Sequence, residues 1–70
     1  MEMKCMVVST NKEMIPTDVV EYIRTLANIR DVSDDGDLMI VVVSSEKTDL
    51  LDEYCSTHGL ELKKLPGLSF

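Results

Sequence analysis

The chain has 70 residues, of which 44% are hydrophobic and 29% are charged, and its formal net charge at pH 7 is -6. A chain of this length buries only about 60% of the surface that its unfolded form exposes. We therefore expect one domain over residues 1–70. Because a single small domain leaves no room for a cleft between domains, we expect a binding or carrier role and not an enzyme.

The acidic residues are concentrated in residues 31–53, which carry eight carboxylates and one lysine, for a net charge of -7. Such a surface repels a phosphate backbone, and neutralisation of phosphates supplies nearly all non-specific affinity for nucleic acids. We therefore expect no nucleic-acid partner. We predict instead that acidic side chains steer a basic partner protein toward this segment. The residues that we assign to this steering are Asp34, Asp35, Asp37 and Asp52.

The apolar runs are six residues or shorter, whereas about 20 apolar residues are needed to span a bilayer. The start of the chain also lacks the charged leader and apolar segment of a signal peptide. Its two cysteines, Cys5 and Cys55, are too few for a disulfide scaffold. We expect a cytoplasmic protein with two reduced thiols and no membrane partner.

The first half of the chain predicts a strand followed by a helix. Residues 5–9 have apolar side chains on both faces of an extended segment. Pro16 suits the first turn of a helix, where its missing N–H would be unpaired in any case. Apolar side chains then recur at helical spacing and form the expected buried stripe of this helix, at Val19, Tyr22, Ile23, Leu26 and Ile29.

Residues 38–43 form an uninterrupted apolar run rich in β-branched side chains, which predicts a buried strand. Ser45 can cap a second helix, and this helix is expected to end at Gly59 with a positive φ. Its expected buried stripe consists of Leu50, Leu51, Tyr54 and Cys55. Residues 60–63 alternate as a half-buried strand does, and an apolar tail follows at residues 68–70.

Residues 30–37 are either a loop or a short strand, 30–33, that turns through Asp35 and Gly36 into the next strand. The strand gives the βαββαβ, ferredoxin-like order, in which charged residues blunt the two edge strands. We therefore predict an α+β fold, a two-layer sandwich with two helices on one face of a small mixed sheet.

Two helices on one face leave one row of the apolar run uncovered. Exposed apolar patches mark interfaces, so we predict that the helix-free face binds a partner protein or a second copy in a homodimer. The residues that we assign to this face are Met39, Val41, Val43 and Phe70. Alternatively, residues 68–70 or residues 1–3 fold over this row.

Two arrangements resemble metal sites. Asp31, Ser33, Asp35 and Gly36 occupy positions 1, 3, 5 and 6 of a calcium loop, but position 12 is Val42 where a glutamate is required. Cys55 and His58 lie three residues apart, but we interpret Cys55 as a small core residue and His58 as a histidine favoured at a helix C-terminus by the helix dipole. We therefore expect no metal, no cofactor and no catalytic residue, and we interpret residues 31–37 as an acidic hairpin turn.

The segment 38–62 combines an apolar strand, Ser44-Ser45, the sequence Leu51-Asp52-Glu53-Tyr54-Cys55 and the strand start Leu60-Glu61-Leu62. This pattern resembles the second half of the TusA/SirA-like sulfur-carrier family, and residues 16–29 resemble its first helix. The resemblance implies a two-layer fold, in βαβαββ order in that family, and a protein-docking surface. The family's Cys-Pro-x-Pro motif, which holds the carrier thiol, falls on residues 15–18, where Ile15 replaces the cysteine.

The length and the βαββαβ order also resemble ferredoxin-like regulatory modules such as ACT domains, although the Pro-Gly of their ligand loop reads Pro16-Thr17 here. That resemblance implies a dimer that binds a small metabolite. We expect a small cytoplasmic protein-interaction domain, a degenerate relative of the sulfur carriers that lacks the carrier cysteine, and we keep the dimeric metabolite sensor as the alternative.

Overall fold

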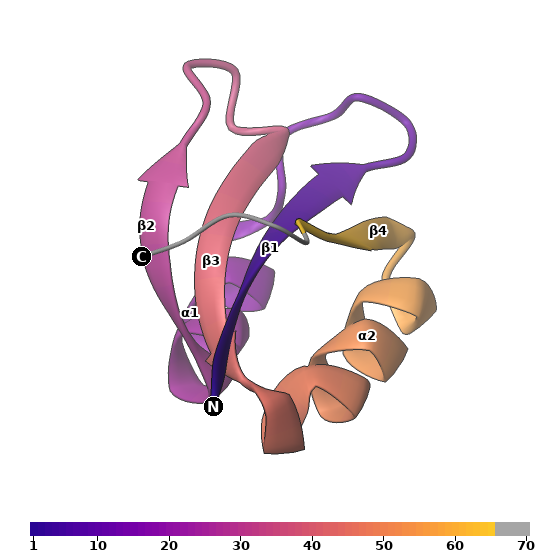
Figure 1. Ribbon diagram of the computed structural model, residues 1–70. Helices are drawn as coiled ribbons and strands as arrows, with labels where there is room; N and C mark the ends of the chain where they lie inside the picture. The colour runs from indigo at the N-terminus through magenta and orange to yellow at the C-terminus, as the bar shows by residue number, and fades with distance from the viewer. Residues whose placement is uncertain (66–70) are drawn as a thin grey trace.

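The computed structural model describes residues 1–65 and places four strands and two helices in two layers (Figure 1). In chain order the elements are β1 (Glu2–Ser9), α1 (Thr17–Leu26), β2 (Ala27–Val32), β3 (Leu38–Ser44), the 3₁₀ turn η1 (Ser45–Lys47), α2 (Thr48–Thr57) and β4 (Leu60–Lys64). This is the βαββαβ order, and the predicted α+β sandwich is confirmed. The βαβαββ order of the sulfur carriers is not observed.

The sheet is antiparallel and not mixed as we predicted. Its strand order is β2-β3-β1-β4, and each neighbouring pair runs in opposite directions. The reason is that each helix connects two strands with a third strand lying between them. Strands joined by a helix are thus parallel to each other but never adjacent. The two central strands, β1 and β3, are the two most apolar ones, as the sequence predicted.

The first helix is shorter than its apolar spacing predicted. It ends at Leu26, and Ala27 is already extended, with φ -148° and ψ 163°. β2 begins at once, and Ile29 pairs with Val41 of β3. The apolar spacing did not reveal where the helix ends because it also fits a strand. Ala27 and Ile29 lie two residues apart, and residues two apart share one face of a strand. Ile29 is therefore a residue of the sheet and not of the helix.

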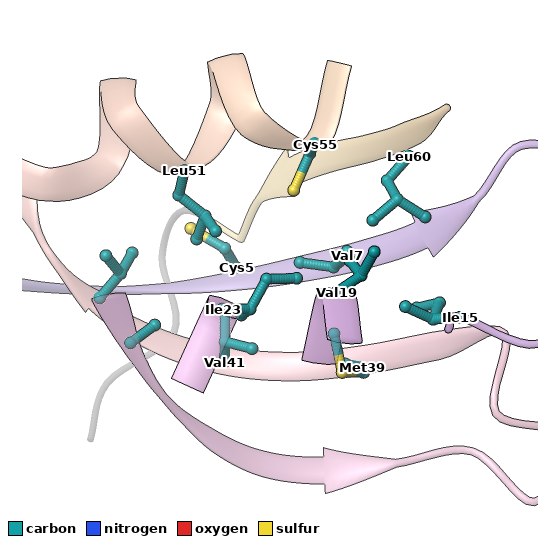
Figure 2. Packing of buried hydrophobic residues seen from close by; sticks show 12 residues of the cluster. Cys5, Val7, Ile15, Val19, Ile23, Met39, Val41, Leu51, Cys55 and Leu60 are labelled. Carbon is teal, nitrogen blue, oxygen red and sulfur yellow. The ribbon is translucent and has the colours of Figure 1, made fainter. Parts of the chain in front are cut away.

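The core lies between the sheet and the helices (Figure 2). Pairing of Cys5 with Val41 and of Val7 with Met39 places four of its side chains on one face of the two central strands. Helical residues cover this face, and Figure 2 shows Val19, Ile23, Leu51 and Cys55 among the side chains that do so. The helix-facing row of β3 therefore consists of Met39, Val41 and Val43.

This arrangement corrects the expected interaction face. Met39 and Val41 are 0% exposed and Val43 is 1% exposed, so these residues lie in the core and not on the helix-free face. Both rows of β3 are equally apolar, and their chemistry alone cannot distinguish the covered row from the open one. The open row contains Leu38 and Ile40, which are half-buried, and Val42, which is buried. Phe70, the fourth residue assigned to the face, lies outside the described residues.

The turn between β2 and β3 confirms the predicted acidic hairpin. Gly36 has φ +71°, and its N–H donates to the Ser33 carbonyl over 2.9 Å. The Ser33 hydroxyl donates to an Asp37 carboxylate oxygen over 2.9 Å. These bonds hold Asp37 in the turn, whereas Asp34 and Asp35 are exposed.

The second helix begins later than predicted. Ser45 belongs to η1, and no side-chain hydrogen bond caps either η1 or α2. The Thr48 hydroxyl donates back to the Ser44 carbonyl over 3.1 Å, which ties the start of α2 to the end of β3. The end of the helix is as predicted, because Gly59 follows His58 with φ +72°.

Candidate functional site

The outer surface of the helix layer carries a stack of three rings. The rings of Tyr22 on α1 and Tyr54 on α2 lie 4.2 Å apart between centroids, with 32° between their planes. His58, just after α2, also packs on Tyr54, with its ring centroid 4.2 Å from that of Tyr54. The three rings therefore connect α1 with the C-terminal end of α2.

Beside this stack lies a groove of about 260 Å³. We call it the tyrosine groove, and it is lined by Tyr22, Leu50, Glu53, Tyr54 and Thr57. Four of its five residues come from α2, where they are spaced by three or four positions and so share one face of the helix. Thr48, Leu51 and Cys55 form the neighbouring face, which is buried. The helix thus has a core face and a groove face.

Exposed apolar side chains gather at this groove. Leu50 is 56% exposed and Tyr22 is 46% exposed, while Tyr54 is half-buried between them. The prediction that Leu50 and Tyr22 lie in the core is therefore wrong. Consecutive residues of a helix point about 100° apart, and because Leu51 is 0% exposed on the core face, Leu50 lies at the edge of that face and is directed to the groove.

The electrostatic environment of the groove is acidic. The pKa of Tyr54 is raised above its ordinary value of 10.0, first by burial and then by the negative charge of Asp18. Glu53 supplies a second carboxylate in the wall of the groove. Within residues 1–65 neither Asp18 nor Glu53 is part of an ion pair. An apolar groove with two uncompensated acids nearby suits a ligand that is both apolar and positively charged.

The four predicted steering residues do not form one site. Asp34, Asp35 and Asp37 belong to the hairpin turn, whereas Asp52 lies on α2. Asp52 is exposed and contributes to the electrostatic field around Cys55. Their contribution to steering is therefore a property of the whole surface, and it stays a prediction.

The two cysteines are core residues. Both are 0% exposed, and Figure 2 shows Cys55 reaching from α2 toward the sheet. Burial raises the pKa of Cys5, and burial followed by the charge of Asp52 raises the pKa of Cys55 to about 11. Both thiols are thus protonated at neutral pH, which is unfavourable for nucleophilic chemistry.

The possible metal pair of Cys55 and His58 is not assembled. Cys55 lies in the core, whereas His58 is exposed and stacks on Tyr54 at the surface. Throughout the part of the chain from residue 1 to residue 65, no three His, Cys, Asp or Glu side chains are grouped so that they could hold a metal ion.

A second hollow, of about 250 Å³, has a different character. Its lining is mainly polar and includes Arg24, Asn28 and Lys47. None of the exposed large apolar side chains of the described chain lines it. The tyrosine groove therefore has the composition expected of a protein-binding surface, and the polar hollow does not.

Comparison with known protein families, curated proteins and solved structures found no match for this chain. No helix within residues 1–65 has the length and apolar character needed to cross a membrane.

Sequence reasoning missed this groove, although one signal was present. The second helix carries two apolar pairs at a spacing of four, Leu50 with Tyr54 and Leu51 with Cys55, and these pairs lie on neighbouring faces. An apolar residue next to the core stripe, with Tyr54 four positions later, indicates a second apolar face. The pairing of Tyr54 with Tyr22 depends on how the helices pack, and no local pattern shows it.

Proposed function

We propose that this chain is a small, non-enzymatic protein-interaction domain that binds a segment of a partner protein in the tyrosine groove. The observation that carries the proposal is the gathering of Tyr22, Leu50 and Tyr54 into one groove on the outer surface of the helices. Aromatic side chains in such positions contribute a large share of the affinity at protein interfaces. Stacking on Tyr54 also restrains the Tyr22 ring, so that less conformational entropy is lost on binding.

The charge of the groove supports a basic partner polypeptide. The whole chain carries a formal charge of -6, and the groove adds the local carboxylates of Glu53 and Asp18. A second copy of this acidic chain would be repelled from the groove by charge. We therefore propose that the occupant is a segment with an apolar anchor and a positive charge.

The proposal also covers the compartment in which the protein acts and its relation to the sulfur carriers. Two protonated, buried thiols suit a reducing compartment, so we propose that the protein acts in the cytoplasm. The resemblance to the sulfur carriers extends to the sequence pattern but not to their βαβαββ order, and Ile15 stands in place of the carrier cysteine, so we propose protein docking without sulfur transfer.

Selection from a displayed library of random peptides, with the whole chain as bait, tests the proposal. We expect selected peptides to carry an apolar residue flanked by basic ones, and Tyr22→Ala or Leu50→Ala to weaken their binding at least tenfold. Val32→Ala is the matched control, since it truncates an apolar side chain that is 47% exposed on β2 and does not line the groove. Peptides that bind both groove variants as tightly as the original chain, or a selection that yields no peptide, would contradict the proposal.

The dimeric metabolite sensor stays the second candidate because the chain has the βαββαβ order of ferredoxin-like modules. In that case the homodimer would form through the helix-free face of the sheet. Sedimentation at high concentration, together with thermal shifts on addition of amino acids or nucleotides, distinguishes the two. A strict monomer with no thermal shift would exclude the sensor.

A further inference from the structure

We infer that the tyrosine groove selects an arginine of the partner, whose guanidinium stacks on the exposed side of Tyr22 and pairs with Glu53. This inference rests on the proposed function and specifies the chemistry of the bound segment. It follows from three features of the groove: the available ring face, the uncompensated acids and the apolar floor.

The first feature is the ring that remains accessible. Tyr54 packs against two rings, those of Tyr22 and His58, each with its centroid 4.2 Å from the centroid of Tyr54. The ring of Tyr54 is therefore largely occupied, whereas Tyr22 is 46% exposed. A planar guanidinium is well suited to this position because it stacks on an aromatic face and is weakly hydrated.

The second feature is an excess of negative charge that the chain does not neutralise. Along its length α2 carries Asp49, Asp52 and Glu53 and no basic residue. Asp49 and Glu53 lie four positions apart on one face of the helix, where like charges destabilise it. The Thr57 hydroxyl donates to the backbone carbonyl of Glu53 over 2.9 Å and so does not occupy its carboxylate. A cation bound here would relieve the repulsion.

The third feature is the position of the apolar floor. Leu50 lies between these two acids in the sequence and is 56% exposed beside Tyr22 and Tyr54 in the groove. An arginine on Tyr22 places the neighbouring partner residue near Leu50. The guanidinium can donate two parallel hydrogen bonds to the Glu53 carboxylate, which a lysine ammonium cannot do. The segment thus requires an arginine next to an apolar residue.

A double-mutant cycle with a selected peptide tests this inference. Glu53→Gln should weaken binding of an arginine peptide about tenfold, whereas its effect on the same peptide with arginine replaced by glutamine should be less than twofold. Replacement of the arginine by lysine should also weaken binding. Asp52→Asn is the matched control, since it removes the same charge from the adjacent residue, which does not line the groove.

The outcomes separate the two proposals. If peptides bind through Tyr22 and Leu50 but Glu53→Gln and Asp52→Asn have equal effects, the pairing with arginine is wrong and the docking groove stands. The same conclusion follows if lysine peptides bind as tightly as arginine peptides. If binding does not depend on Tyr22 or Leu50, the proposed function itself fails.

Discussion

The thiol of Cys55 connects the packing of a single residue to the stability of the whole chain. Its side chain is completely buried between α2 and the sheet, and its pKa rises from 9.0 to about 11, chiefly through burial and then through the charge of Asp52. The folded protein therefore holds this proton more tightly than the unfolded protein does. The resulting stabilisation is fully present below pH 9 and is lost as the pH rises through about 11.

We expect the free energy of unfolding to fall by roughly 2–3 kcal/mol between pH 9 and pH 11 because of this thiol. Urea denaturation across this range, compared between the original chain and Cys55→Ala, isolates the contribution, since the two proteins differ only in this side chain. Cys5, whose pKa burial also raises, adds a decrease of the same sign that remains in the variant. Equal pH dependence in the two proteins would show that Cys55 loses its proton as readily in the folded state as in the unfolded one.

Within α2, two adjacent leucines have different roles. Leu51 is 0% exposed in the core, whereas Leu50 is 56% exposed in the tyrosine groove. We expect Leu51→Ala to lower the free energy of unfolding by about 2–5 kcal/mol, because it removes buried methyl groups and leaves a cavity. Leu50→Ala should change it by less than about 0.5 kcal/mol. Urea denaturation of both variants measures this difference.

Each leucine variant is the control for the other, because both make the same substitution in the same helix. Leu50→Ala should weaken peptide binding while the fold remains intact. Comparable losses of stability in the two variants would show that the helix is rotated relative to the arrangement described here, with Leu50 also in the core.

The type and order of the helices and strands could be predicted from the sequence. Which face of each strand or helix lies in the core could not. The apolar run 38–43 and the glycine at 59 define a strand and a helix end through local chemistry. The covered row of β3, by contrast, depends on its register with β1, which pairs Cys5 with Val41. That register is a long-range property. The same limit explains why Met39 was assigned to the wrong face.

At the scale of the whole molecule, the small size of the domain explains why a groove forms on the helix layer. Helices of ten residues each bury only two or three side chains against the sheet, as Val19 and Ile23 of α1 show. Of the other apolar residues of these helices, Val20, Leu26 and Tyr54 pack partly against the core, whereas Tyr22 and Leu50 are exposed and line the groove. A larger domain would add a further layer over them. Here the groove is open to a partner.

Two acidic regions should then act at different stages of binding. The exposed carboxylates of Asp34 and Asp35 lie in the β2–β3 turn and do not line the groove. Charges of this kind accelerate the encounter with a basic partner through the field of the molecule, without forming contacts in the complex. Glu53, in the wall of the groove, should instead stabilise the complex once it has formed.

Stopped-flow measurements with an arginine-containing peptide distinguish these two effects. We expect the double variant Asp34→Asn/Asp35→Asn to lower the association rate constant severalfold at low ionic strength and to leave the dissociation rate constant unchanged. The difference should largely vanish at about 1 M salt, where the screening length falls to about 3 Å. Glu53→Gln should chiefly raise the dissociation rate constant. A faster dissociation in the turn variant would place the hairpin in the interface, and the binding surface would then extend beyond the two helices.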